Sequence, residues 1–168
     1  RDHELSELIY TWYNDLVMDD YHYNVAELVK EYESTYGLSI NADQLYWQSN
    51  SQGPYPEWDL SRVFDSVRID DTSGDYVTDI EFAGRSTDVD VYTDVLVDGY
   101  YDTVECDEST LAELGVSEES ISARMEIANA AKAFIDKVWE MIHDVCTSYP
   151  DEEWIRDILS ANEIEFIV

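Results

Sequence analysis

The fold is decided by residues 117–149, which read SEESISARMEIANAAKAFIDKVWEMIHDVCTSY. Apolar residues recur there every three or four positions, the spacing that places them on one face of an α-helix. They are Ile121, Met125, Ala128, Ala131, Ile135, Val138, Ile142, Val145 and Tyr149. Ser117 is a favourable N-cap, and Pro150 ends the pattern. We predict a helix of about 48 Å that lies across a sheet.

The sheet is predicted from the residues before this helix, where the apolar pattern changes to a period of two. Turn sequences at 71–74, 84–86 and 98–99 separate strand candidates at 62–69, 75–83, 87–97 and 100–105. Strands joined by such short turns form an antiparallel meander.

The two ends of the chain are predicted to be mainly helical. We expect helices over residues 3–18 and 24–36, the second capped near Asn24 and ended by Gly37. Short strands at 38–40 and 45–48 precede a loop at 49–57, which contains Gly53, Pro54 and Pro56. After the meander come a short helix at 109–114, a last helix at 151–161 and a terminal strand at 163–168.

These elements predict an α+β fold, an antiparallel β-meander packed against one long helix with smaller helices at the N- and C-terminal ends. We expect a single domain over residues 1–168. It divides into a helical part (1–37), strands and loop (38–107), and helices with a final strand (108–168).

The chain is extremely acidic, with 39 Asp and Glu residues against 9 Lys and Arg and a net charge of −30. Because 45% of the residues are hydrophobic, the acidity does not imply disorder. Such a charge disfavours nucleic acid and anionic membranes as direct partners and favours a basic protein surface. With no apolar run of transmembrane length and only two cysteines, Cys106 and Cys146, we expect a cytoplasmic protein.

The acidity is concentrated in the middle of the chain. Residues 69–123 contain 16 acidic residues and one basic residue, Arg85. Alternate residues of a strand lie about 6.6–6.8 Å apart on one face, so carboxylates at alternate positions would form a row of anions. The predicted acidic surface consists of Asp79, Glu81, Asp88, Asp90, Asp94, Asp98, Asp102 and Glu105. Such a row resembles the phosphates of nucleic acid.

Two simpler explanations compete with phosphate mimicry. A run of charge is usually a solvated face, although like charges placed side by side on a sheet repel one another. Salt-adapted proteins are also rich in Asp and Glu and poor in lysine, and this chain has only Lys30, Lys132 and Lys137.

No catalytic, cofactor or metal site is complete in the sequence. Residues 94–105 match a calcium-binding EF-hand loop in part, but Leu96 stands where an oxygen ligand is needed. Glu140 and His143 have di-iron spacing but lack a second pair, and His3 and His22 belong to no triad pattern. We therefore predict a protein that is not an enzyme and holds no metal or cofactor.

Both ends of the chain resemble a widespread family of uncharacterised tailed-phage proteins that carry an automatic antitoxin-like label. The matching residues are Leu5, Trp12, Tyr13, Asp19, Asp20, Tyr23, Gly37, Leu38, Ser39, Ile40, Leu45, Tyr46, Ser51, Gln52, Gly53, Ile158, Leu159, Ser160, Ala161, Asn162, Glu163, Glu165 and Phe166. The chain departs from the family after Gly53, where Pro54 and Pro56 occur. The resemblance implies phage origin and an intracellular accessory role, with no established activity.

Together these features predict a phage-type inhibitor that mimics the charge of DNA. Its expected partner is a basic DNA-binding host protein, a restriction or other defence enzyme, inside an infected bacterial cell. An antitoxin-like accessory protein without DNA mimicry and a halophilic acidic protein are the alternatives. The sequence also allows a homodimer.

Overall fold

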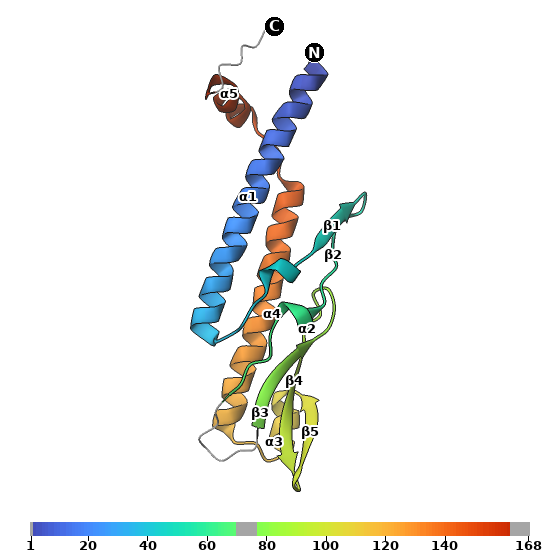
Figure 1. Ribbon diagram of the computed structural model, residues 1–168, viewed down its shortest axis with the longest axis vertical. Helices are drawn as coiled ribbons and strands as arrows, with labels where there is room; N and C mark the ends of the chain where they lie inside the picture. Colours follow the sequence, from blue (N-terminus) through green and yellow to red (C-terminus); the bar gives the residue numbers. More distant parts are fainter. Residues whose placement is uncertain (1, 70–76, 162–168) are drawn as a thin grey trace.

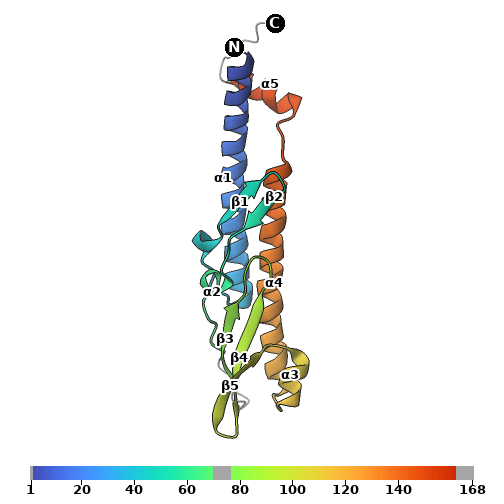
Figure 2. The same ribbon diagram turned by 90° about the vertical axis from the view of Figure 1, so that its right-hand side faces the viewer.

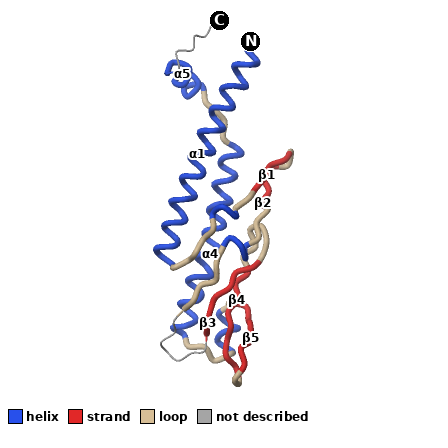
Figure 3. Tube along the Cα trace, in the orientation of Figure 1, coloured by secondary structure: helices blue, strands red, loops and turns tan. Residues whose placement is uncertain are grey.

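The computed structural model describes residues 2–69 and 77–161. It has an α+β fold, as predicted, built from two long helices, three shorter ones, a 3-10 turn and two small antiparallel sheets (Figures 1 and 3). The elements are α1 (Asp2–Tyr36), η1 (Ala42–Gln44), β1 (Trp47–Asn50), β2 (Gly53–Pro56), α2 (Leu60–Val63), β3 (Val77–Ala83), β4 (Asp90–Val97), β5 (Tyr100–Glu105), α3 (Glu108–Glu113), α4 (Glu118–Thr147) and α5 (Glu152–Ala161).

Helix α4 confirms the long predicted helix almost to the residue. The Ser117 side chain caps it by accepting a hydrogen bond from the backbone N–H of Ser120 at 3.3 Å. Most of the predicted stripe is buried, and Ile135, Val138 and Ile142 are completely inaccessible. Tyr149 was wrongly included in the stripe, because α4 ends at Thr147 and the Tyr149 side chain is 75% exposed.

The N-terminal region is one helix of 35 residues, not the two predicted. Residues 19–24 contain no glycine or proline to interrupt it, and Tyr21 in the middle of this segment is buried. The predicted end is right: Gly37 has φ +73° and donates its N–H to the Glu33 carbonyl at 3.0 Å. Helix α1 runs antiparallel to α4 along much of its length, so the molecule is elongated (Figures 1 and 2).

Most of residues 49–57, where a loop was predicted, belong to strands β1 and β2. β1 pairs with β2 as an antiparallel hairpin, and its turn begins with Asn50, whose side chain accepts the Gln52 N–H at 2.8 Å. Pro54 and Pro56 are compatible with this sheet because a two-stranded hairpin leaves alternate backbone N–H groups unpaired.

The predicted meander is present as the sheet β3-β4-β5, with Asp98 and Gly99 at positive φ in the second turn. The first predicted strand, residues 62–69, is wrong. Asp59 caps the short helix α2 there, accepting the Ser61 N–H at 3.1 Å, and α2 buries Leu60 and Val63. Beyond it, Phe64 and Val67 form only single bridges, to Ile40 and Ile80. The predicted turn at 71–74 and the strand at 163–168 lie outside the described residues.

One hydrophobic core joins the sheet to the helices. The inner face of the sheet buries Ile80, Phe82, Val91 and Val95. The Phe64 ring connects this face to α4, with centroids 4.9 Å from Phe82 and 5.9 Å from Phe134. The opposite face of the sheet carries part of the predicted acidic surface.

Candidate functional site

The outer face of the three-stranded sheet collects acidic side chains from all three strands. The register pairs Tyr92 in β4 with Glu81 in β3 on one side and Glu105 in β5 on the other. Paired residues project on the same face, so these three side chains form a line across the sheet. Asp90 and Asp94 lie on the same face of β4, since Val91, Thr93 and Val95 between and beyond them are buried on the other.

The structure divides the eight predicted residues into three groups. Five of them, Asp79, Glu81, Asp90, Asp94 and Glu105, share the outer face, which we name the acidic face. Asp79 is half-buried and lies where the pairing register shifts, and its place follows from its alternation with the buried Ile80. Asp88 and Asp98 lie in turns at the two ends of β4 and are exposed. Asp102 pairs with Val95, so its side chain projects from the opposite face of β5.

The acidic face is less densely charged than a continuous row. Tyr92 separates Glu81 from Glu105, which places these strand positions about 9.5 Å apart at two strand spacings. Asp90 and Asp94 are four residues apart, about 13 Å along the strand. These separations are comparable with the Debye length of about 10 Å at 0.1 M salt. The sheet therefore tolerates its carboxylates because neutral residues alternate with them.

The carboxylates of the acidic face are available to a partner. Among the described residues, none of the five forms an ion pair. Asp94 accepts one hydrogen bond, from the Thr103 hydroxyl at 2.6 Å across the β4–β5 pair. This bond orients the Asp94 carboxylate and leaves acceptor positions open.

The chain segment that contains β4, β5 and α3 carries no positive charge, and the exposed Arg85 lies just before it. Residues 86–123 contain 11 acidic residues and no lysine, arginine or histidine. The first cation after them is Arg124, whose side chain is fully buried within the fold. Burial removes this charge from the surface, so β4, β5, α3 and the start of α4 present carboxylates alone. The apolar stripe did not predict a buried arginine in α4.

The β4–β5 hairpin ends in two exposed aromatic residues that the sequence interpretation missed. Tyr100 is 78% exposed and Tyr101 is 59% exposed, and both follow the Asp98–Gly99 turn at the tip of the sheet (Figure 2). Tyrosine is enriched in protein interfaces because its ring buries a large area and its hydroxyl stays polar. The sequence signal that could have identified these residues is a Tyr-Tyr pair directly after a tight turn.

In the part of the chain that the structure describes, the residues of the candidate metal and catalytic motifs do not form a site. Residues 94–105 form a hairpin whose Asp94 and Asp102 side chains project on opposite faces. The His143 ring lies on α4 against Trp139, with Nδ1 3.0 Å from the Trp139 carbonyl oxygen, and His3 pairs with Glu7 on α1. Burial raises the pKa of the Cys106 thiol. Among the described residues, no three His, Cys, Asp or Glu side chains gather closely enough to hold a metal ion.

Comparison of the chain with protein-family models, with curated proteins and with solved structures finds no match. The resemblance to tailed-phage proteins therefore stays a prediction. Within the described residues, no helix combines the length and apolar composition that crossing a membrane requires.

Proposed function

We propose that this protein is a non-enzymatic acidic inhibitor that binds the DNA-binding surface of a host protein, such as a restriction or other defence enzyme. The observation that carries the proposal is the cation-free surface over residues 86–123, with 11 carboxylates and the next cation, Arg124, buried. A surface that carries charge of one sign attracts a surface of opposite charge and raises the rate of association.

The total charge is of the size that DNA mimicry needs. Duplex DNA carries one negative charge per about 1.7 Å, so it reaches −30 over about 51 Å. Helix α1, with 35 residues, spans about 52 Å on its own. The sheet extends the molecule beyond the end of α1 (Figure 1), so the average charge per unit length is somewhat below that of a duplex. The mimicry we propose acts through the negative potential of this cation-free surface, since the acidic face does not reproduce phosphate spacing.

Tyr101 adds contact area to this electrostatic attraction, because it pairs with Leu96 and projects on the acidic face, whereas Tyr100 pairs with Val97 and projects on the opposite face. DNA-binding surfaces are rich in arginine, and a guanidinium group stacks favourably on a tyrosine ring. We therefore include Tyr101 in the proposed interface, beside Asp94 and the turn residue Asp98.

A second candidate is an antitoxin-like accessory protein that binds a basic partner without imitating DNA. The wide spacing of charges on the acidic face and the two exposed tyrosines favour it, because both suit an ordinary protein interface. A salt-adapted protein is the third, and the exposed carboxylates distributed along α1 suit that explanation.

Competition with DNA separates the first two candidates. The immobilised protein is exposed to bacterial lysate at low salt, and bound proteins are eluted first with a short DNA duplex and then with high salt. Mimicry predicts a DNA-binding protein in the duplex eluate. A partner that only high salt removes would favour the antitoxin-like function and contradict mimicry.

A further inference from the structure

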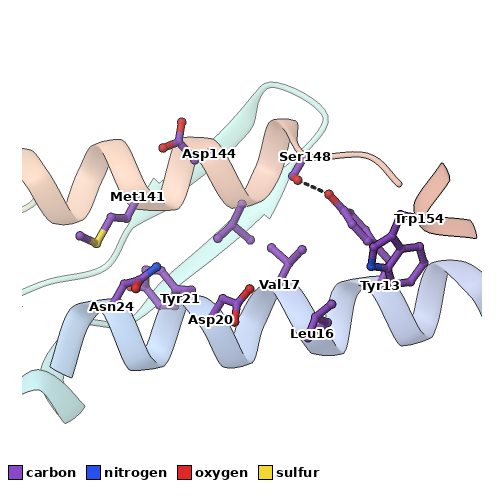
Figure 4. Close-up of a pocket in the computed structure, with 11 residues that line it drawn as sticks. Tyr13, Leu16, Val17, Asp20, Tyr21, Asn24, Met141, Asp144, Ser148 and Trp154 are labelled. Carbon is purple, nitrogen blue, oxygen red and sulfur yellow. Dashed lines mark hydrogen bonds between the residues drawn. The ribbon is translucent and has the colours of Figure 1, made fainter. Parts of the chain in front are cut away.

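A cleft of about 390 Å³ lies between α1 and the C-terminal end of α4 (Figure 4). This end of α4 lies far from the three-stranded sheet (Figure 1). Its volume is in the lower part of the range of small-molecule sites. Val17 from α1 and Met141 and Val145 from α4 form an apolar floor. All three side chains are half-buried, so a ligand resting on them would remove more apolar surface from water.

Aromatic side chains from separate helices form one end of the cleft. The Tyr13 ring of α1 meets the Trp154 ring of α5 edge to face, with centroids 4.9 Å apart and planes at 78°. The Tyr13 hydroxyl also forms a hydrogen bond with the Ser148 hydroxyl, just after the end of α4 (Figure 4). These two contacts join α1, α4 and α5, so this wall is held in place before any ligand arrives.

The charge at the cleft is entirely negative. Asp20 and Asp144 border it, and no lysine, arginine or histidine lines it. Within the part of the chain that the structure describes, neither carboxylate forms an ion pair. In Figure 4, Asp20 lies between the two helices, whereas Asp144 projects from α4 away from α1.

We propose that this cleft binds a small organic cation with an apolar stem, an alkylammonium. The stem rests on Val17, Met141 and Val145, and the ammonium group lies by the Asp20 carboxylate. Tyr13 and Trp154 add apolar contact at the end of the cleft. An anion of the same shape is repelled by the carboxylates, and a neutral analogue gains only the apolar contact. The inference does not depend on the proposed function, since none of its residues lies on the acidic face.

Calorimetric titration with three six-carbon ligands tests the assignment. We expect hexylammonium to bind with 1:1 stoichiometry, about fivefold or more tightly than 1-hexanol, and hexanoate not to bind. Asp20→Asn should weaken hexylammonium binding about fivefold while leaving 1-hexanol binding unchanged. Trp154→Leu should weaken both, and circular dichroism checks that it folds.

Asp19→Asn is the matched control, because this substitution removes the same charge as Asp20→Asn. Asp19 is exposed, lies next to Asp20 in the sequence and does not line the cleft. Equal weakening by Asp19→Asn would overturn the proposal, because it would assign the binding to the general electrostatic field of the protein. Equal affinity for 1-hexanol and hexylammonium would also overturn it, because it would assign the binding to apolar contact alone. Capped lysine identifies the source of the cation. Binding of both hexylammonium and capped lysine supports a lysine side chain as ligand, whereas binding of hexylammonium alone supports a free amine.

Discussion

Carboxylates lie in opposite settings near the two ends of helix α4. At the sheet end, the acidic face is open and its five charged residues are all carboxylates. At the other end, Asp20 and Asp144 border a cleft with an apolar floor and two aromatic rings. The same side-chain chemistry thus suits two kinds of partner. An open acidic face attracts a broad basic surface, whereas a carboxylate beside apolar and aromatic groups selects a small organic cation.

The largest expected loss of stability comes from a substitution in the middle of α4, the helix that supports both ends of the molecule. Ile135 is completely buried, so Ile135→Asp places a charge in the core and should cost about 5 kcal/mol or more, against a typical total of about 5–15 kcal/mol. Chemical denaturation measures the loss. Asp136→Asn on the neighbouring exposed position is the control and should change little. A variant as stable as wild type would show that this face of α4 is not buried.

A substitution with a smaller effect on stability tests whether the two ends of the molecule are independent. Phe64 contacts Phe82 in the sheet and Phe134 in α4, so Phe64→Ala should lower the unfolding free energy by about 3–4 kcal/mol. Because Phe64 is not part of the cleft, the folded variant should still bind hexylammonium. Loss of that binding in a variant that circular dichroism shows to be folded would mean that the two ends are coupled.

The smallest effect concerns the cap of α3 and its dependence on pH. Hydrogen bonds from Ser109 and Thr110 hold the pKa of Asp107 below its ordinary value of 3.8. Since the folded pKa is the lower one, this stabilisation is present above pH 3.8 and is lost as the pH falls through the depressed value. Asp107→Ala should therefore lower Tm at pH 7, with the difference from wild type shrinking below pH 3.8.

Asp102→Ala serves as the control for this cap, since the Asp102 side chain is exposed and forms no hydrogen bond among the described residues. A Tm difference for Asp107→Ala that stays constant from pH 7 to pH 3 would contradict the account.

The sheet end could be predicted from the sequence because its signals are local. The alternation of valine and aspartate in β4, the Asp98–Gly99 turn and the Ser117 cap each depend on residues a few positions apart. The sequence does not show which acidic residues share a face of the sheet, since only the pairing register shows that Asp102 projects away from Asp94.

The cleft end could not be predicted, because distant residues assemble it. Tyr13 and Ser148 are 135 residues apart, and no periodic pattern links them. The continuity of α1 was missed for a related reason. Residues 19–24 are polar enough to suggest a break, but the burial of Tyr21 in the assembled core holds the helix together. The burial of Arg124 is likewise a property of the packed fold.

The central claim, that the acidic face binds the DNA-binding surface of a partner, is tested most directly by the salt dependence of binding to the protein captured in the duplex eluate. The acidic-face variant combines Glu81→Gln, Asp90→Asn, Asp94→Asn and Glu105→Gln. The control variant removes the same charge from exposed positions of α1 by Asp15→Asn, Asp19→Asn, Glu27→Gln and Glu31→Gln.

Affinity measured from 50 to 500 mM salt gives the slope of log K against log salt concentration, which reports the counterions released. We expect the acidic-face variant to fold as stably as wild type, to bind at least about tenfold more weakly at low salt and to show a shallower slope. The control variant should keep most of the affinity and nearly the wild-type slope. Equal losses in the two variants, or an acidic-face variant that binds like wild type, would contradict the claim that this face is the binding surface.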